Sequence, residues 1–270
     1  MLPNFLGVGV QKSGTTSLHS ILSKHPQIYL PSVKETGFFS RDEFYLRGVQ
    51  WYEKAFFSNW KSEKAVGEIC TSYIYLDYVA KRIHDTFGTN IKFILMLRNP
   101  VDRAYSHYNM SYKRGIEDKD FKTALRMEDS RLSNNDDFKV LDCFSYINRG
   151  YYAEQIERYL YFYSLDQMLF IVFEDFIKDQ YKSIDKILNF LNLEPLNDVV
   201  NYNVKKNSSS FIKNKFIRNF LYKPSIFKNM LKPYLPLKMK VAVSHFIEEK
   251  TQSEFLPPPL DIDTRMKLMD

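Results

Sequence analysis

The sequence predicts an α/β fold with three layers, α/β/α, around a central parallel sheet. Two observations lead to this prediction. Short apolar runs, β-branched in part as buried parallel strands are, alternate along the chain with helical patterns. The first apolar run leads into a glycine-containing loop and then into a helix, an arrangement that suits a phosphate-like anion at the helix N-terminus.

Four segments are expected to form the strands of this sheet: Phe5–Val10, Ile28–Leu30, Lys92–Leu97 and Met168–Phe173. A helix over Thr16–Lys24 follows the first strand. It ends ahead of His25-Pro26, because the residue before a proline avoids the helical region of backbone space.

Further helices are expected after the third and fourth strands. Pro100 opens one of them, since a proline in the first helical position lacks only an N–H that the helix does not need. Apolar residues at helical spacing predict helices over Tyr152–Tyr163 and Phe176–Leu191. Residues 115–145 are expected to form helices and loops over the sheet, and residues 256–270 an extended segment and the start of a helix.

The bulk composition is that of a globular protein. With 270 residues, 44% of them hydrophobic and 16% aromatic, the chain is expected to form a single domain over residues 1–270 and not a disordered segment. Two cysteines allow one bridge, but they do not indicate a disulfide framework and they favour a reducing compartment. No His, Cys and carboxylate cluster has metal-ligand spacing. Without a signal-like start or a membrane-length apolar stretch, a cytoplasmic location is expected.

The net charge of +6 is unevenly placed along the chain. From Lys205 to Lys240 there are many lysines, Arg218 and no acidic residue. A solvated basic face, a polyanionic cofactor, an acidic acceptor or an anionic surface would each account for this run. No nucleic-acid recognition motif accompanies it, so nucleic acid is not expected as a partner.

The loop from Gly9 to Ser17 reads Gly-Val-Gln-Lys-Ser-Gly-Thr-Thr-Ser. Gly9 and Gly14 have the spacing of a Walker A loop, but Thr15 stands where the lysine of that motif belongs. The lysine is instead Lys12, inside the loop, where it can reach an oxygen between the two groups of a mixed anhydride. The loop resembles the phosphosulfate-binding loop of sulfotransferases, but a nucleotide kinase and an ordinary strand–turn–helix remain open from this segment alone.

A second candidate anion site follows the third predicted strand. Arg98 ends that strand, at the edge where open α/β sheets bind ligands, and Ser106 lies about two turns into the next helix. A guanidinium fork suits a phosphate or a carboxylate. The alternative is that Arg98 pairs with Asp102 or another local carboxylate and that Ser106 faces solvent.

Together the two segments resemble the sulfotransferases that use 3′-phosphoadenosine 5′-phosphosulfate (PAPS). The loop around Lys12 resembles their phosphosulfate-binding loop, and the string from Arg98 to Ser106 resembles their 3′-phosphate-binding motif. The resemblance extends over roughly residues 5–265 and is greatest to the heparan-sulfate-type branch and its bacterial relatives. It implies that Arg98 and Ser106 hold the 3′-phosphate. It also implies that Lys12 contacts the 5′-phosphosulfate, with help from Ser13, Gly14, Thr15, Thr16 and Ser17.

A candidate base lies in the segment from Lys34 to Phe39, which resembles the Lys-Glu-x-x-Phe-Phe motif of the same branch. The resemblance implies that Glu35 is the catalytic base, a role that needs a carboxylate within reach of the acceptor proton. The alternative is an exposed charged pair ahead of a Phe38-Phe39 anchor. Two positions depart from the family pattern, since Ile69 replaces a lysine and Gly37 replaces a histidine found in some relatives.

Further contacts to the nucleotide are implied by two more segments. Tyr151, in Arg149-Gly150-Tyr151-Tyr152, would line the adenosine pocket, and Lys205 and Lys206 would lie in a basic loop over the 3′-phosphate. The expected reaction moves a sulfuryl group from PAPS to a hydroxyl or amine, on a carbohydrate acceptor, without a metal, and releases adenosine 3′,5′-bisphosphate (PAP). A P-loop kinase and a non-catalytic protein that binds an anionic glycan or a nucleotide are the alternatives.

Overall fold

The structure is a computed structural model, and it describes residues 1–133, 137–195, 210–212, 252–254 and 257–268. The strands are β1 (Phe5–Gly9), β2 (Ile28–Tyr29), β3 (Ala65–Ile69), β4 (Lys92–Leu97), β5 (Met168–Val172), β6 (Ser210–Ile212) and β7 (Gln252–Glu254). The α-helices are α1 (Thr15–Leu22), α2 (Asp42–Tyr45), α3 (Gly48–Phe56), α4 (Val79–Phe87), α5 (Pro100–Lys113), α6 (Phe121–Arg126), α7 (Glu128–Leu132), α8 (Phe138–Phe144), α9 (Tyr152–Leu160), α10 (Phe173–Lys178), α11 (Gln180–Phe190) and α15 (Ile262–Lys267). Two 3₁₀ turns, η1 (Asn148–Gly150) and η2 (Leu165–Gln167), complete the described elements.

A five-stranded sheet with the order β2-β3-β1-β4-β5 forms the centre of the fold. Each neighbouring pair of strands in it runs parallel, so the carboxyl ends of all five strands meet at one edge. Each crossover between parallel strands needs a long connection, and helices supply most of these connections. The α/β fold with a central parallel sheet that the sequence predicts is therefore confirmed.

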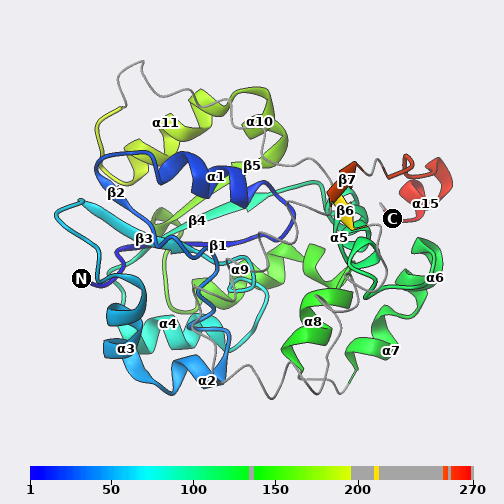
Figure 1. Cartoon of the computed structure of the whole chain (residues 1–270), viewed down its shortest axis with the longest axis horizontal. Helices are drawn as coiled ribbons and strands as arrows, with labels where there is room; N and C mark the ends of the chain where they lie inside the picture. Colours follow the sequence, from blue (N-terminus) through cyan, green and yellow to red (C-terminus); the bar gives the residue numbers. More distant parts are fainter. Residues whose placement is uncertain (134–136, 196–209, 213–251, 255–256, 269–270) are drawn as a thin grey trace. The chain divides into compact units, whose positions relative to one another are not determined.

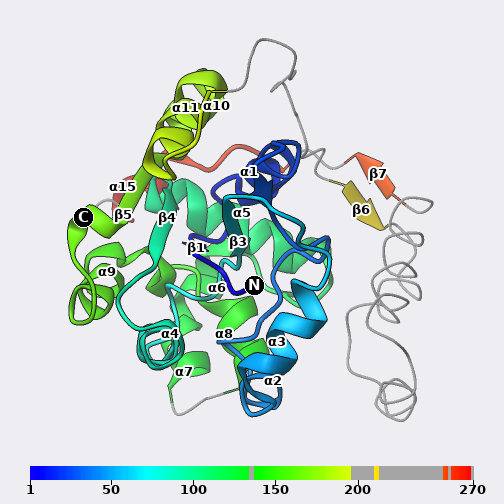
Figure 2. The ribbon, with the colours of Figure 1, turned by 90° about the vertical axis from the view of Figure 1, so that its left-hand side faces the viewer.

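Helices cover both faces of this sheet, as Figures 1 and 2 show. On one face α1, α10 and α11 pack against the strands through one apolar cluster, to which α1 contributes Leu18 and α11 contributes Ile184 and Ile187. On the other face the ring of Tyr159 in α9 meets Phe93 of β4 edge-on, with ring centres 5.3 Å apart. The three layers hold the strand ends, and the loops that leave them, in fixed positions.

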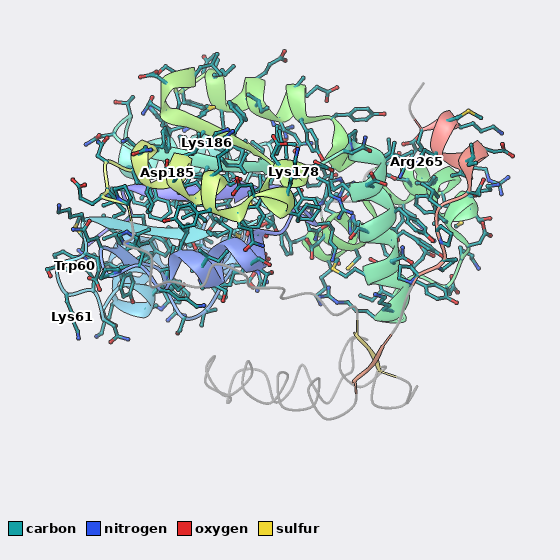
Figure 3. The ribbon with its side chains drawn as sticks, turned by 90° about the horizontal axis from the view of Figure 1, so that it is seen from above. Trp60, Lys61, Lys178, Asp185, Lys186 and Arg265 are labelled. Carbon is teal, nitrogen blue, oxygen red and sulfur yellow. The ribbon has the colours of Figure 1, made fainter. Side chains whose placement is uncertain are left out.

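The helix predicted over Phe176–Leu191 is divided into α10 and α11. Asp179 lies between them, and its carboxylate accepts a hydrogen bond from the Lys182 amide at 2.9 Å, which caps the start of α11. Figure 3 shows Lys178 and Lys186 as labelled side chains on these helices; both are exposed, whereas the apolar residues of α11 face the sheet. The helical spacing was therefore read correctly, but the capping aspartate was missed.

Strand β3 was not predicted, because Gly67 and Glu68 interrupt its apolar pattern. Both residues are explained by contacts with other segments of the chain. A Cβ at position 67 would lie 2.5 Å from the ring of Phe5 in β1, so only glycine allows the two strands to pair here. The carboxylate of Glu68 is buried, which is tolerated because hydroxyl groups donate hydrogen bonds to it. Tertiary packing thus overrides the weak strand pattern.

The chain divides into two compact units, and each is described by itself. The first contains Met1–Arg103 and Arg149–Lys206 and holds the parallel sheet; the second contains Ala104–Asn148 and Asn207–Asp270. In the second unit an apolar cluster around Tyr108, Phe121 and Tyr146 packs residues of α5, α6 and the segment after α8 together. The predicted single domain over residues 1–270 stays a prediction. None of the helices in the described part of the chain has the length and hydropathy needed to cross a membrane.

Candidate active site

The loop between β1 and α1 is shaped to point backbone amides at one spot. Lys12 and Gly14 both adopt the left-handed backbone conformation, with φ of 73° and 79°, so the chain turns sharply before the helix. The amides of a first helical turn point beyond the helix N-terminus, and here the Leu18 amide donates to the Gly14 carbonyl at 3.1 Å. The first turn of α1, which the structure describes in full, contains no acidic side chain. An anion is therefore favoured at this position.

Hydroxyl groups line the same loop. Ser13, Thr15 and Ser17 are buried, whereas Thr16 is exposed. The Ser13 hydroxyl is fully buried, and no hydrogen-bond partner for it exists among the described residues. A buried hydroxyl without a partner is costly, and an anionic oxygen bound in the loop would supply that partner.

Gly14 is required for two separate reasons, its backbone conformation and the lack of space for a side chain. A Cβ at position 14 would lie 2.8 Å from the ring of Phe173. Gly48 provides a matched control, since its φ is 80° and nothing lies within 4 Å of a Cβ added there. We predict that Gly14→Ala lowers the free energy of unfolding by about 2–4 kcal/mol, from left-handed strain plus overpacking, and Gly48→Ala by about 1 kcal/mol. Urea unfolding of both variants measures the difference, and equal losses would contradict a steric role for Gly14.

Arg98, at the end of β4, is joined directly to this loop. Its Nη1 donates a hydrogen bond to the Lys12 carbonyl at 2.9 Å, and its guanidinium lies over the ring of Phe173, 4.7 Å from the centre. Burial lowers the pKa of Arg98, while the charges of Asp102 and Glu174 act in the opposite direction. Its Nε is buried and has no partner among the described residues. One donor of the fork therefore shapes the loop, and another has no acceptor in the described part of the chain.

Tyrosines follow Arg149 at the start of α9, and they differ in their surroundings. Tyr152 donates its hydroxyl hydrogen to the Arg98 carbonyl at 2.9 Å, whereas Tyr151 is 51% exposed. Tyr151, the residue that the sequence assigned to the adenosine pocket, is thus half exposed to solvent. Tyr152 instead fixes the backbone at the end of β4.

Glu35 lies beside the end of β3, held there through its backbone. Its amide donates to the Ile69 carbonyl at 3.1 Å, and its φ of 62° is left-handed, a conformation that costs a residue with a side chain about 1 kcal/mol or more. Its Oε1 accepts hydrogen bonds from the Lys34 ammonium and, at 3.1 Å, from the Thr71 hydroxyl. Phe38 and Phe39 beyond it are buried, so the apolar anchor and the charged pair are both present.

The electrostatic surroundings keep the Glu35 carboxylate ionised. Burial among protein atoms raises its pKa, but the nearby Lys34 charge, hydrogen bonds from Lys34 and Thr71, and the Arg149 charge together lower it below the ordinary glutamate value. The side chain is 42% exposed, so water reaches the carboxylate and weakens the effect of burial. The pKa of Glu35 is therefore lowered and not raised.

Arg149 is a site residue that the sequence did not single out. It is 3% exposed, and its guanidinium stacks over the ring of Tyr75 at 4.2 Å from the ring centre. Its charge acts on Glu35, which lies more than a hundred residues away in the chain. The Arg149-Gly150 pair was the available signal, but attention fell on the tyrosines that follow it.

Sheet topology explains how these groups come together. The strands β3, β1 and β4 are adjacent, and they lead respectively to Thr71 beside Glu35, to the Lys12 loop and to Arg98. All three strand ends lie at the same edge of a parallel sheet, where ligands bind in α/β folds. Ser106 is half-buried in the part of α5 that belongs to the second unit. Lys205 and Lys206 lie outside the described residues, as does most of the basic run.

Comparison with known proteins adds independent information. The chain matches the sulfotransferase domain family over residues 2–254. The membrane-associated sulfotransferase kil1 of Dictyostelium discoideum is 42% identical over 112 residues, which cover 41% of this chain and 23% of that protein. The bifunctional heparan sulfate N-deacetylase/N-sulfotransferase 4 of Mus musculus is 33% identical over 205 residues, or 72% of this chain and 23% of that protein.

A solved structure agrees with these matches. The crystal structure of a sulfotransferase from Alicyclobacillus acidocaldarius has a TM-score of 0.66 and 29% identity, and the match covers 91% of this chain and 96% of that one. The chain spans about a quarter to a half of the curated relatives, for example 54% of the Mus musculus heparan sulfate glucosamine 3-O-sulfotransferase 5. The resemblance seen in the motifs is thus confirmed over most of the sequence, and the chain belongs to the sulfotransferase family.

Proposed function

We propose that this chain is a PAPS-dependent sulfotransferase that transfers a sulfuryl group to a hydroxyl or amine of a carbohydrate acceptor. The observation that supports it most is the Lys12 loop. This loop has no acidic side chain in the helix turn that follows, contains a fully buried Ser13 hydroxyl without a partner in the described chain, and is tied to the Arg98 fork. These features favour a ligand with negative charge at two places.

The residues present fit the donor. When bound, PAPS supplies an activated sulfuryl group on a mixed anhydride. The Lys12 ammonium, the Ser13 hydroxyl and the amides of Gly14 to Ser17 would hold the 5′-phosphosulfate, and Arg98 with Ser106 the 3′-phosphate. Tyr151, Lys205 and Lys206 are proposed as further nucleotide contacts. The predicted independence from metal ions is part of this proposal.

Glu35 is proposed as the base. An acceptor hydroxyl becomes a better nucleophile as a positioned carboxylate takes its proton, and Glu35 is ionised for this task at neutral pH. The Lys34 ammonium, which donates a hydrogen bond to the Glu35 carboxylate, supplies a positive charge beside it. Lys12 and the loop amides would stabilise the negative charge that appears as the sulfuryl group leaves the nucleotide.

The acceptor class and the location rest on less direct support. Relatives named as heparan sulfate sulfotransferases favour a carbohydrate acceptor. Cys70 and Cys143 are not joined in a disulfide, in keeping with the reducing, cytoplasmic compartment that we propose. Fractionation of the cells that produce the protein would test the compartment.

A transfer assay tests the proposed activity. The chain is incubated with radiolabelled PAPS and a panel of glycans, aminosugars and simple alcohols, and with radiolabelled ATP and magnesium in parallel. Label transferred from PAPS to a sugar supports the proposal. Transfer from ATP would show a kinase instead, and tight PAP binding without any transfer would show a non-catalytic binding protein.

The role of Arg98 has a separate test in binding. We predict that Arg98→Ala weakens PAP binding roughly tenfold to a hundredfold, because a charge-assisted hydrogen bond contributes about 1.5–3 kcal/mol. The substitution also removes the Arg98–Lys12 hydrogen bond that shapes the loop, so binding of adenosine 5′-phosphate, which has no 3′-phosphate, weakens too, but by less. Arg98→Lys is the matched control, since it keeps the charge but not the fork, and it gives an intermediate loss. Calorimetric titration measures both ligands, and equal losses for the two nucleotides would contradict the 3′-phosphate role.

A further inference from the structure

A second glutamate, Glu68, lies close to the base in the fold but fully inside the protein. It is the fourth residue of β3, and it is 1% exposed. Its Oε1 accepts hydrogen bonds from the hydroxyls of Tyr52 and Tyr73, each at 2.7 Å, and its Oε2 accepts one from the Thr36 hydroxyl. The carboxylate therefore collects three hydroxyl donors that come from three separate segments.

Two of these donors belong to the segments that touch Glu35. Thr36 is the next residue after Glu35, and Tyr73 lies two residues after Thr71, whose hydroxyl donates to the Glu35 carboxylate. The Glu35 amide donates a hydrogen bond to the carbonyl of Ile69, the residue that follows Glu68 in β3. Glu68 is thus connected to both sides of the base.

The same network reaches the aromatic anchor beyond the base. The Phe38 amide donates to the Thr36 hydroxyl and the Phe39 amide to the Tyr73 hydroxyl, each at 3.3 Å. The ring of Phe38 stacks on Tyr52, with ring centres 4.2 Å apart. The segment from Thr36 to Phe39 is therefore fixed at both ends by hydroxyls that Glu68 holds.

This network explains how Glu35 keeps an unfavourable backbone conformation. A left-handed residue that is not glycine persists only where its surroundings determine the conformation. Here that conformation turns Thr36 into the interior and leaves the Glu35 side chain 42% exposed at the strand edge. Loss of the Thr36 bond would remove one of the restraints on this turn, beside the bond from the Glu35 amide to the Ile69 carbonyl.

We infer that Glu68 is a positioning residue for sulfuryl transfer, a buried carboxylate that fixes the segment carrying the base Glu35. The inference rests on the proposed function, in which Glu35 takes the acceptor proton. Glu68 itself is too deeply buried to touch an acceptor, so its effect passes through Thr36 and Tyr73. Transfer should then depend on the Thr36 hydroxyl, although that hydroxyl faces away from solvent.

Hydroxyl deletions on the two sides of Glu68 make a matched test. Thr36→Val and Tyr52→Phe each remove one buried hydroxyl that donates to the same carboxylate, but only Thr36 adjoins the base, and Thr36→Val also removes the acceptor of the Phe38 amide. We expect Thr36→Val to lower kcat roughly tenfold to a hundredfold, as small misplacements of a catalytic group do. The KM for PAPS and the Kd for PAP stay unchanged. Thr36→Ser restores the rate, and Tyr52→Phe keeps at least half of it.

The pH dependence of kcat provides a second readout. A general loss of stability would not shift its acid limb. Lys34, Arg149 and the Thr71 hydroxyl face Glu35 and together lower its pKa. The Cys70 thiol is also nearby, and burial and then the Glu35 charge raise its pKa. A displaced Glu35 loses these contacts, so its pKa rises and the acid limb of kcat moves to higher pH. Glu68→Gln is expected to give the same shift, and if that variant does not fold, Thr36→Val carries the test alone.

The outcomes separate this inference from the proposed function. If Glu35→Gln retains transfer, the base assignment fails. If Glu35→Gln abolishes transfer but Thr36→Val leaves kcat and the acid limb unchanged, only the positioning role of Glu68 fails. Equal losses of kcat in Thr36→Val and Tyr52→Phe, with no shift of the acid limb, would show that the network serves stability alone.

Discussion

Replacing Glu35 with glutamine is expected to lower kcat for sulfuryl transfer by about two to four orders of magnitude, the usual contribution of a general base. Glutamine has nearly the same shape and keeps an oxygen that can accept from Lys34 and Thr71, but it cannot take a proton. PAP binding should stay within about twofold, because Glu35 is not among the groups proposed to hold the nucleotide. Transfer of label from PAPS and calorimetric titration of PAP measure the two quantities.

The pH dependence of the unmodified enzyme follows from the same residue. The base must be deprotonated, and the pKa of Glu35 lies below the ordinary glutamate value because Lys34, Thr71 and Arg149 outweigh burial. Activity should therefore be constant on the acid side of neutrality and fall only below about pH 4.5, where an unshifted glutamate would titrate. An acid limb near neutral pH would assign the base to another group.

The control for Glu35 is a glutamate close to it in sequence but outside the site. Glu43 is exposed in the first turn of α2, so Glu43→Gln removes the same charge from the chain and should retain full transfer. If the two variants lose activity equally, the loss comes from net charge or from folding. If Glu35→Gln keeps its rate, the resemblance of this segment to the family motif does not extend to its chemistry.

The sequence predicted the parts of the fold in which local pattern and tertiary structure agree. Strands such as Lys92–Leu97 are buried on both faces and appear as continuous apolar runs, so their pattern is unambiguous. Strand β3 carries a glycine and a glutamate whose reasons lie in other segments, in the ring of Phe5 and in the hydroxyl of Tyr52. No local pattern could reveal either reason.

Some residues of the candidate site were also predictable from local sequence features, and others were not. The spacing of Lys12 and Gly14 and the position of Arg98 at a strand end are local features, and the sequence places them correctly on the elements of the fold. Arg149 and Glu68 act through space on a segment that follows β2, and these contacts could not be read from the sequence. Buried charges of this kind are held by partners distant in the chain, which a single sequence does not specify.

At position 12 the effects of a substitution on stability and on activity can be measured separately. The backbone conformation there favours glycine, whereas the proposed role in transfer needs the lysine ammonium. With φ of 73° the position suits glycine, and its carbonyl, which accepts the Arg98 bond, remains in any variant. In Lys12→Gly the relief of left-handed strain and the extra freedom of the unfolded chain nearly cancel. The free energy of unfolding should therefore change by less than about 1 kcal/mol.

Transfer should respond quite differently from stability in this variant. The ammonium is proposed to stabilise charge that develops only as the sulfuryl group leaves, so its loss should lower kcat by about a hundredfold to a thousandfold, the usual cost of one such donor. Lys24→Met, which removes an exposed lysine just beyond α1, serves as the charge control and should retain the rate. Urea unfolding and label transfer on the same preparations give both numbers. A stable Lys12→Gly protein with full activity would show that the loop binds the donor through amides and hydroxyls alone. A stable but inactive one would show that a strained lysine is kept in the loop for its charge.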